Sequence, residues 1–501
     1  MTQRKFSVLS EVVGPHPDER FLASDPVVAH VTADSRDVRP GSVFVCMPSA
    51  SRDTHEFLSE VKSKGAIGAI VHSSSGLEKA KALDLAGLWI EPVGSRFNFA
   101  VGRFCRDVFG DPTSRMRMIG ITGTNGKTTT AWMMRNALVA LGRPAAYLGT
   151  LGFQTQGEMR ELNNTTPFPV ELWNLLAEAE ASGMQDFVME SSSHALFERR
   201  LAGVQYDVGL FTNFSQDHLD FHGSMEAYAA AKQLLFTEYA AASEKTFVGA
   251  LNLADDVGRA WSRELPCRTL TYGASDADLQ TTATDVRVDG IRMSAQYGGE
   301  RAEMNLKVGG LFNVENAGSA LAGLLGLGIE LADAAHALES VTGVPGRFEA
   351  VLNDRGFGII VDYAHTPDAL ELLLKSARAL SPRRIITVFG CGGDRDRSKR
   401  PKMAAVVSQH SEISVLTSDN PRTEDPAAIL RDVAVGLRPE AESTQIIDRR
   451  EAIAYAVGIA EPGDLVVIAG KGHEDYQIIG RTKHPMDDRL MARDALAKVT
   501  T

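Results

Sequence analysis

The stretch GITGTNGKTTT, residues 120–130, decides the fold of the central part of this chain. A short apolar strand ends in glycines, and Gly-Lys-Thr then opens a helix. Small residues let backbone N–H groups turn toward an anion, and the helix N-terminus adds a positive partial charge. Lys127 would lie beside the β and γ phosphates of a nucleotide, and the Thr128 hydroxyl would face Mg²⁺. The stretch therefore predicts a nucleoside triphosphate site between a strand and a helix.

The glycine spacing of this stretch differs from the common P-loop. The pattern Gly-x-x-x-x-Gly-Lys requires glycine at position 121, where this chain has Ile121. A glycine-rich turn without a ligand is the alternative, but a Gly-Lys-Thr run directly after a strand favours a phosphate loop. The loop residues predicted to bind the nucleotide are Gly123, Thr124, Asn125, Gly126, Lys127, Thr128 and Thr129.

The composition indicates an acidic protein with several domains. At 501 residues the chain exceeds what one hydrophobic core usually serves, and roughly 150 residues per domain predicts about three domains. The net charge of −12 argues against a nucleic-acid or anionic-membrane partner. The four cysteines include no Cys-x-x-Cys pair, and no run of about 18 apolar residues occurs. We therefore expect a cytoplasmic monomer that is not inserted in a membrane.

Breaks in the strand and helix pattern predict an α/β fold with three domains. Residues 1–95 contain short strand-like runs at 41–45 and 66–71, separated by helical pattern. Residues 96–343 contain the phosphate loop, and residues 344–501 repeat a layout of apolar strands and helices. We expect a small N-terminal α/β domain, a central P-loop ATPase domain and a C-terminal Rossmann-like domain.

Polar residues follow the apolar runs of the second and third segments. Glu190 comes directly after the run 187–189, and Asp362 follows 359–361. Unbroken apolar runs are typical of buried parallel strands, and ligands of open α/β sheets bind beyond the carboxyl ends of such strands. These polar residues therefore mark the expected ligand sites.

Ordered motifs along nearly the whole chain give a family resemblance. They are Asp34-Ser35-Arg36, the phosphate loop, Asn164 to Pro167, Glu190 to Leu196 with Arg200, Thr212 to His222, Ala231-Lys232, Pro345 to Glu349, Asp362 to Asp368, Gly390 to Asp396, Asp419 to Arg422, and Gly470 to Glu474. With these motifs the chain resembles the Mur ligases, and among them those that add diaminopimelate. Ligases of this family also carry the shifted glycine spacing of the phosphate loop.

The resemblance implies the residues of an ATP and Mg²⁺ site. Lys127 and Thr128 would bind ATP phosphate and Mg²⁺, and Glu190 and His218 would hold metal. Residues further along the chain would contact the nucleotide: Asn316 and Asp362 at adenosine, and Arg347 at phosphate.

Lys232 lies in a helix-like run, where its default is an exposed lysine. The resemblance implies a carbamate instead. Burial favours the neutral amine, which can take up CO₂ and become an anion able to hold Mg²⁺.

The resemblance also implies two substrate sites. Ser35 would face the uridine end of a UDP-linked substrate, and its peptidyl part would contact Thr165, Thr166, Ser192 and Arg200. Helix caps and turns are the alternative roles for the Ser and Thr residues, and a solvated surface is the alternative for Arg200. The amino-acid pocket would comprise Arg395, Asp419, Asn420, Pro421, Arg422, Gly470 and Glu474.

Arg422 is expected to distinguish between two amino-acid substrates that the family uses. Diaminopimelate carries a carboxylate that lysine lacks, and a guanidinium fork matches a carboxylate through two parallel hydrogen bonds. The resemblance implies ATP-dependent amide synthesis, through an acyl phosphate, in peptidoglycan precursor synthesis. In this reaction meso-2,6-diaminopimelate is joined to UDP-N-acetylmuramoyl-L-alanyl-D-glutamate. The alternatives are a lysine-adding Mur ligase, a folylpolyglutamate synthetase-like ligase, and a non-enzymatic nucleotide switch.

Overall fold

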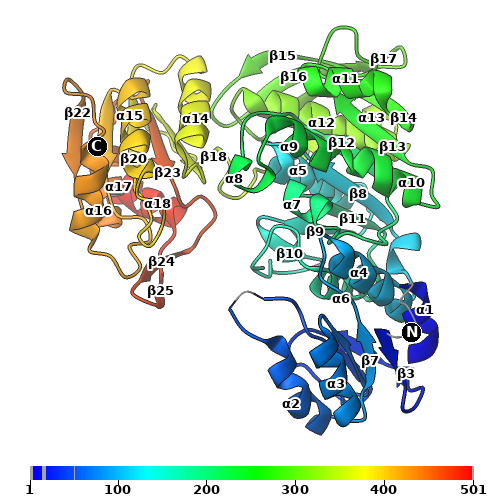
Figure 1. The fold of residues 1–501 in the computed structure, drawn as a ribbon. Coiled ribbons are helices and arrows are strands. Elements are labelled where there is room, and N and C mark those ends of the chain that lie inside the picture. Colours follow the sequence, from blue (N-terminus) through cyan, green and yellow to red (C-terminus); the bar gives the residue numbers. More distant parts are fainter. Residues whose placement is uncertain (1–3, 14–18, 50, 499–501) are drawn as a thin grey trace. The chain divides into compact units, whose positions relative to one another are not determined.

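A computed structural model describes residues 4–13, 19–49 and 51–498 of the protein. Contacts divide the chain into two compact units. The first unit comprises Met1–Leu279 and Ser319–Glu330, and the second comprises Gln280–Gly318 and Leu331–Thr501. Figure 1 shows the elements of each unit. The predicted domain boundaries at 95/96 and 343/344 stay predictions, since both units contain more than one sheet.

The first unit begins with a five-stranded sheet of order β2-β7-β6-β5-β4, in which β2 is antiparallel to β7 and the other pairs are parallel. Its strands are β2 (Arg20–Phe21), β4 (His30–Thr32), β5 (Ser42–Val45), β6 (Gly68–Val71) and β7 (Ala86–Trp89). The short strands β1 (Arg4–Lys5) and β3 (Val27–Val28) pair separately. Helical segments of this part are α1 (Phe6–Val12), the 3₁₀ turn Thr54–Phe57, α2 (Leu58–Ser63) and α3 (Ser74–Ala82).

A seven-stranded sheet of order β10-β9-β11-β8-β12-β13-β14 forms the rest of the first unit, and only the β10–β9 pair is antiparallel. Its strands are β8 (Arg117–Thr122), β9 (Ala145–Gly149), β10 (Gly152–Gln154), β11 (Asp186–Glu190), β12 (Val208–Phe211), β13 (Val248–Asn252) and β14 (Arg268–Tyr272). Its helices are α4 (Arg96–Phe109), the 3₁₀ turn Pro112–Ser114, α5 (Lys127–Ala140), α6 (Pro169–Ala181), α7 (Ser193–Phe197), α8 (Leu219–His222), α9 (Met225–Gln233), the π-helix Leu235–Tyr239, α10 (Ala240–Ala242) and α11 (Asp256–Glu264).

One apolar core joins the two sheets of the first unit. It runs from Phe6 and Val31 in the N-terminal part through Phe104 on α4 to Trp173 on α6. Helices α4 and α6 contact each other and β4 (Figure 1). The N-terminal sheet therefore shares its core with the central sheet, which is why contacts place both in one unit.

The second unit contains two larger sheets and a hairpin. The sheet β15-β16-β17 is antiparallel, and the sheet β18-β19-β23-β20-β21-β22 is parallel except for the β18–β19 pair. The strands are β15 (Gln280–Val286), β16 (Ile291–Tyr297), β17 (Glu300–Leu306), β18 (Glu349–Ala350), β19 (Gly358–Asp362), β20 (Ile385–Phe389), β21 (Ile413–Leu416), β22 (Glu442–Gln445), β23 (Leu465–Ala469), and the hairpin β24 (Tyr476–Ile479) with β25 (Thr482–Pro485). The helices are α13 (Leu331–Glu339), α14 (Pro367–Ala379), α15 (Lys399–His410), α16 (Pro426–Ala434), α17 (Arg449–Gly458) and α18 (Asp488–Lys498), while α12 (Phe312–Gly326) contributes to both units.

The predicted α/β class and the predicted strands are confirmed. The apolar runs that end at Glu190 and Asp362 form β11 and β19, which are buried along almost their whole length. The helix after the phosphate loop ends just before Gly142, as predicted, because that glycine takes a φ of +74°. Parallel strands bring their carboxyl ends to one edge of each sheet, so the polar residues that follow them gather there.

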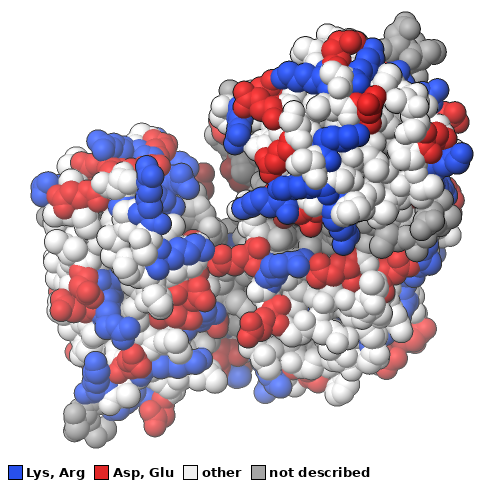
Figure 2. All heavy atoms as spheres, turned by 90° about the horizontal axis from the view of Figure 1, so that it is seen from below, with Lys and Arg blue, Asp and Glu red and all other residues white. Residues whose placement is uncertain are grey.

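The surface carries both charge signs. Figure 2 shows Lys and Arg interspersed with Asp and Glu over the face in view. Among the described residues, no helix combines the length and the apolar character needed to cross a membrane.

Candidate active site

The phosphate loop between β8 and α5 is tied to the loop that follows β12. The Thr124 N–H donates to Asn213 O (2.8 Å), the Asn125 N–H to Asn213 Oδ1 (2.9 Å), and the Thr212 hydroxyl to Asn125 O (2.6 Å). Gly123 has a φ of +144°, and a Cβ there would lie 1.9 Å from Thr212 Oγ1. Only glycine therefore lets the two loops approach this closely. Helix α5 begins directly after this loop, and the positive partial charge at its N-terminus favours an anion there.

Two lysine side chains converge on this loop. Lys127 Nζ donates to Gly123 O (3.0 Å) and Thr124 O (2.8 Å), and Lys232 Nζ donates to Gly123 O (2.6 Å). Lys232 is only 1% exposed and lies over the Tyr228 ring at 4.3 Å, so the default of an exposed lysine is wrong. Burial, assisted by the nearby Lys127 charge, holds the pKa of Lys232 well below its ordinary value. The site thus favours a neutral amine at this position.

Glu190, at the end of β11, is fully buried and held by four hydrogen bonds. Thr128 Oγ1 donates to its Oε2 (3.1 Å), and Tyr147 Oη donates to its Oε1 (2.9 Å). Thr150 donates twice, from its N–H to Oε1 (2.8 Å) and from its hydroxyl to Oε2 (3.2 Å). The structure therefore brings two predicted metal ligands, Thr128 and Glu190, into direct contact.

The sequence analysis missed Tyr147 and Thr150. Tyr147 belongs to the apolar run of β9 and carries no polar signal of its own. Thr150 directly follows β9, and the same rule of strand ends that selected Glu190 could have found it.

Three histidine rings lie together near the N-termini of α7, α8 and α9. The His218 ring lies 4.7 Å from the His194 ring, which lies 5.3 Å from the His222 ring. Burial lowers the pKa of His218, against the neighbouring Asp217, and lowers the pKa of His222 to about 4. At neutral pH these rings are neutral and offer lone pairs rather than positive charge.

The residues predicted for the peptidyl part of the substrate form one connected group. The Thr166 hydroxyl donates to Glu190 O (2.7 Å) and accepts from the Ser192 N–H (3.2 Å). Arg200 Nη1 donates to Thr166 O (3.0 Å), and its guanidinium lies 3.9 Å above the Phe168 ring. The Arg200 side chain is 11% exposed, so the alternative of a solvated surface arginine is wrong.

The cap alternative for Ser192 is confirmed, since its hydroxyl accepts from the Ala195 N–H at the start of α7 (3.3 Å). Thr165 is closer to the metal candidates, with its hydroxyl 3.3 Å from the Thr150 hydroxyl. Ser35 lies in the turn that follows β4, where its carbonyl accepts from Lys64 Nζ (2.8 Å). These placements leave the predicted substrate roles of Thr165, Ser192 and Ser35 as predictions.

Three predicted nucleotide residues lie in the second unit. Asn316, on α12, donates from Nδ2 to Asn313 Oδ1 (2.8 Å). Arg347 stacks over the Tyr363 ring at 5.1 Å. Asp362 is buried, with Oδ2 accepting from the Phe348 N–H (2.7 Å) and Oδ1 from the Ala364 N–H (2.8 Å). Burial raises the pKa of Asp362. Its described contacts hold the backbone after β19 in place, and its role at adenosine stays a prediction.

The segment Asp419–Arg422, after β21, is clamped by the hairpin β24–β25. Arg422 has a φ of +51°, and its N–H donates to Ile478 O (3.0 Å) while the Gly480 N–H donates to Arg422 O (2.7 Å). The Arg422 side chain donates from Nη1 to Gly393 O (3.0 Å). Hydrogen bonds on both sides of the residue therefore hold a backbone conformation that non-glycine residues rarely adopt.

The other predicted amino-acid residues lie around this segment. Asn420 Nδ2 donates to Glu474 Oε2 (3.0 Å), and a Cβ at Gly470 would lie 2.9 Å from Asp419 Oδ2. Pro421 is buried, whereas Arg395 is exposed in the loop after β20. The structure thus brings Asp419, Asn420, Gly470 and Glu474 together.

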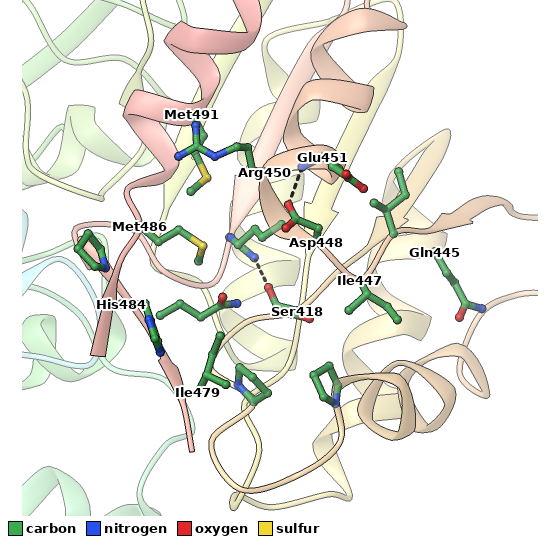
Figure 3. Close-up of a pocket in the computed structure, with 16 residues that line it drawn as sticks. Ser418, Gln445, Ile447, Asp448, Arg450, Glu451, Ile479, His484, Met486 and Met491 are labelled. Carbon is green, nitrogen blue, oxygen red and sulfur yellow. Dashed lines mark hydrogen bonds between the residues drawn. The ribbon is translucent and has the colours of Figure 1, made fainter. Parts of the chain in front are cut away.

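A pocket of about 760 Å³ is lined by Pro421, by residues at the N-terminus of α17 and by the hairpin β24–β25 (Figure 3). Ile447, Ile479 and Met486 supply apolar lining, and Arg449 Nη1 donates to Ser418 O (3.3 Å) at its wall. Of the predicted site residues, only Pro421 lines it.

Comparisons with known proteins match most of the chain. A family model described as "Mur ligase middle domain" matches residues 121–324, and one described as "Mur ligase, glutamate ligase domain" matches residues 346–472. A UDP-N-acetylmuramoyl-L-alanyl-D-glutamate–2,6-diaminopimelate ligase of Syntrophomonas wolfei is 39% identical over 481 residues, covering 94% of this chain and 95% of the relative. The ligase of the same name from Thermosynechococcus vestitus is 41% identical over 484 residues, covering 96% and 95%. A solved structure of a ligase with this name has a TM-score of 0.70 and 31% identity, and the match covers 100% of both chains.

Proposed function

The chain belongs to the Mur ligase family, and on this premise we propose that it joins meso-2,6-diaminopimelate to UDP-N-acetylmuramoyl-L-alanyl-D-glutamate at the expense of ATP. The observation that carries the proposal is the near full-length similarity, at 39% and 41% identity, to ligases of that name. Arg422 lies beside Asn420, which in turn contacts Glu474, and this grouping supports the choice of amino acid. We place this reaction in the cytoplasm, where ATP and UDP-linked sugars are available, and expect a monomer.

The proposed chemistry follows from the poor reactivity of a carboxylate. The γ-carboxylate of the D-glutamyl residue attacks the γ-phosphorus of ATP, so an acyl phosphate forms and ADP leaves. The diaminopimelate amine then attacks the acyl carbon, loses a proton and expels phosphate, which leaves an amide. Lys127 and the N-terminus of α5 would offset the charge of the transferred phosphoryl group.

The residues around Glu190 fit a divalent cation. Mg²⁺ prefers oxygen ligands, and the Thr128 hydroxyl lies 3.1 Å from a fully buried carboxylate whose other contacts are neutral donors. A neutral His218 imidazole would add a nitrogen ligand. Bound Mg²⁺ would neutralise phosphate charge that otherwise repels the acceptor carboxylate. Tyr147 and Thr150 hold Glu190 in one orientation for this role.

Lys232 would supply a second anionic ligand as a carbamate. Its neutral amine attacks CO₂, a nitrogen–carbon bond forms, and one proton leaves, so a neutral amine becomes an anion. The low pKa and burial of Lys232 support this step. Lys232→Ala should lose activity that acetate or formate partly restores, because a small carboxylate can fill the vacated space. An active variant that small carboxylates do not affect would reduce Lys232 to a packing residue.

The substrates are proposed to bind at the groups described above. Thr165, Thr166, Ser192 and Arg200 would hold the peptidyl part of the acceptor, and Ser35 would face the uridine end. Asn316, Arg347 and Asp362 would contact ATP. The proposed domains are residues 1–95 for the UDP substrate, 96–343 for ATP and 344–501 for the amino acid.

Phosphate release tests the proposed function against its alternatives. The purified protein is incubated with ATP, Mg²⁺ and the UDP-linked substrate, with diaminopimelate, with lysine, or with neither. We expect release only with diaminopimelate. Release that lysine supports equally would favour a lysine-adding ligase, and release independent of both amino acids would favour a nucleotide switch.

A further inference from the structure

Lys471 is a buried lysine inside the predicted amino-acid pocket to which the mechanism gives no task. It lies directly after Gly470, and its side chain is 0% exposed. Its Nζ donates to Glu474 Oε2 (2.8 Å) and to Asn420 Oδ1 (3.1 Å). A buried ammonium is costly unless charged and polar partners satisfy it, so these two contacts determine where Lys471 can lie.

Lys471 sets the orientation of the Asn420 amide. An ammonium only donates hydrogen bonds, so the amide oxygen of Asn420 must face it. The Ile478 N–H donates to the same oxygen (2.8 Å), and the amide nitrogen then donates to Glu474 Oε2 (3.0 Å). Lys471, Asn420 and Glu474 thus form a closed triangle of hydrogen bonds.

The triangle also sets the orientation of Glu474. Both described contacts of its carboxylate, from Lys471 and from Asn420, fall on Oε2. With Oε2 engaged in this way, Oε1 is the oxygen that an incoming donor would meet. The carboxylate lies beside a fixed ammonium and presents one defined oxygen instead of rotating between two.

We propose that Lys471 is a positioning residue for amino-acid recognition, which fixes Glu474 and Asn420 as a prearranged acceptor for an ammonium group of the amino-acid substrate. This inference rests on the proposed function, because diaminopimelate supplies that ammonium group. Lys471 itself donates to protein groups and touches no reacting atom. Its loss should therefore weaken amino-acid binding without changing how ATP or the UDP-linked substrate binds.

A matched lysine provides the control. Lys471 and Lys483 both lie over the Tyr476 ring, with Nζ at 5.4 and 3.7 Å from its centroid. Lys483 is exposed on β25, whereas Lys471 is buried next to β23. Lys483→Met therefore removes a lysine from the same aromatic ring without opening the buried triangle.

The test is steady-state kinetics of the full chain with each substrate varied in turn. Lys471→Met should raise the KM for diaminopimelate by roughly tenfold or more, as expected for lost hydrogen bonds to charged groups, while the KM values for ATP and the UDP-linked substrate change by less than about twofold. Lys483→Met should leave all three unchanged. Equal increases in all three KM values, or a wild-type KM for diaminopimelate in Lys471→Met, would overturn the inference. Wild-type protein that ligates no diaminopimelate would instead overturn the proposed function, and the inference with it.

A double variant decides the matter if Lys471→Met does not fold, since that change leaves the Glu474 carboxylate without its cation. Lys471→Met combined with Glu474→Gln removes both charges. Because the Ile478 N–H still holds the Asn420 amide oxygen, the effect of Lys471 on the substrate ammonium runs mainly through Glu474. The double variant should therefore have the same KM for diaminopimelate as Glu474→Gln alone, within about threefold. A further tenfold increase in the double variant would show that Lys471 acts independently of Glu474 and would contradict the proposal.

Discussion

The phosphate loop of the first unit and the segment Asp419–Arg422 of the second unit follow parallel strands, and both contain backbone with positive φ. In the phosphate loop these positions are Gly123 at +144° and Gly126 at +83°, whereas in the other segment the position is Arg422 at +51°. Glycine adopts such angles freely, but a residue with a Cβ pays about 1–2 kcal/mol in the left-handed region. The phosphate loop therefore uses glycine at its positions with positive φ, whereas the segment Asp419–Arg422 places an arginine there.

The difference indicates which part of each segment meets the ligand. In the proposed phosphate site the backbone itself would face the anion, and a side chain at Gly123 would only obstruct the neighbouring loop. The role proposed for Arg422 needs its side chain, and two backbone hydrogen bonds to the hairpin β24–β25 offset the strain.

The largest effect is expected for Lys127→Ala. This change removes the charge that is proposed to offset the transferred phosphoryl group, so it should lower kcat by at least about 10³-fold. Folding should survive, because Lys127 is only half-buried and its loop is also held by the Asn213 contacts to Thr124 and Asn125. Ligation rate and thermal unfolding are measured on the same preparation. Near-normal turnover in a folded variant would remove this loop from the mechanism.

Arg422→Ala should change amino-acid choice. Loss of a charge-assisted fork costs about 1.5–3 kcal/mol, so kcat/KM for diaminopimelate should fall by roughly ten- to hundredfold, and use of lysine should fall far less. Arg422→Lys should recover only part of the loss, since a point charge cannot form two parallel hydrogen bonds. Both amino acids are compared at saturating ATP and UDP-linked substrate. Equal losses for the two would mean that Arg422 supports the fold rather than the choice of substrate.

Gly123→Ala should destabilise the first unit. The added Cβ would collide with Thr212 Oγ1, and such overpacking typically costs about 1–3 kcal/mol in addition to backbone strain. Gly142→Ala is the matched control, because its φ is +74° but no atom lies within 4 Å of the added Cβ. Denaturant unfolding compares the two variants. Similar losses of stability would show that φ, and not the approach of the two loops, requires glycine at position 123.

The smallest effect is expected when Arg422→Gly is compared with Arg422→Ala. Both variants lose the guanidinium, but glycine also relieves the left-handed strain. The free energy of unfolding should therefore be about 1 kcal/mol higher for the glycine variant than for the alanine variant. Their activities with diaminopimelate should be equally low. A less stable glycine variant would mean that the two hydrogen bonds from the hairpin do not hold a strained residue.

The contrast also explains what the sequence could predict. The phosphate loop, β8, α5 and the polar ends of β11 and β19 follow from local patterns: apolar runs, glycines and strand ends. By contrast, the clamp on Arg422 depends on a hairpin more than fifty residues away in the chain, between Tyr476 and Pro485. Short-range patterns contain no information about such a contact.

Buried polar contacts likewise could not be predicted from the sequence. Tyr147 and Lys471 are polar residues in or directly after apolar strands, and only the folded arrangement shows that their partners are Glu190, Glu474 and Asn420. The burial of Lys232 belongs to the same class, because a lysine on a helix is exposed by default. The family resemblance indicated Lys232, but no local pattern could have done so.

A competition between amino acids tests the proposed ligation most directly. The protein is incubated with ATP, Mg²⁺, UDP-N-acetylmuramoyl-L-alanyl-D-glutamate and equal concentrations of meso-2,6-diaminopimelate and lysine, and the UDP-linked products are weighed by mass spectrometry. The two possible products differ by the mass of one CO₂. We expect the diaminopimelate product almost alone, formed together with equal amounts of ADP and phosphate. A dominant lysine product, or ATP hydrolysis without any new UDP-linked mass, would contradict the proposed function.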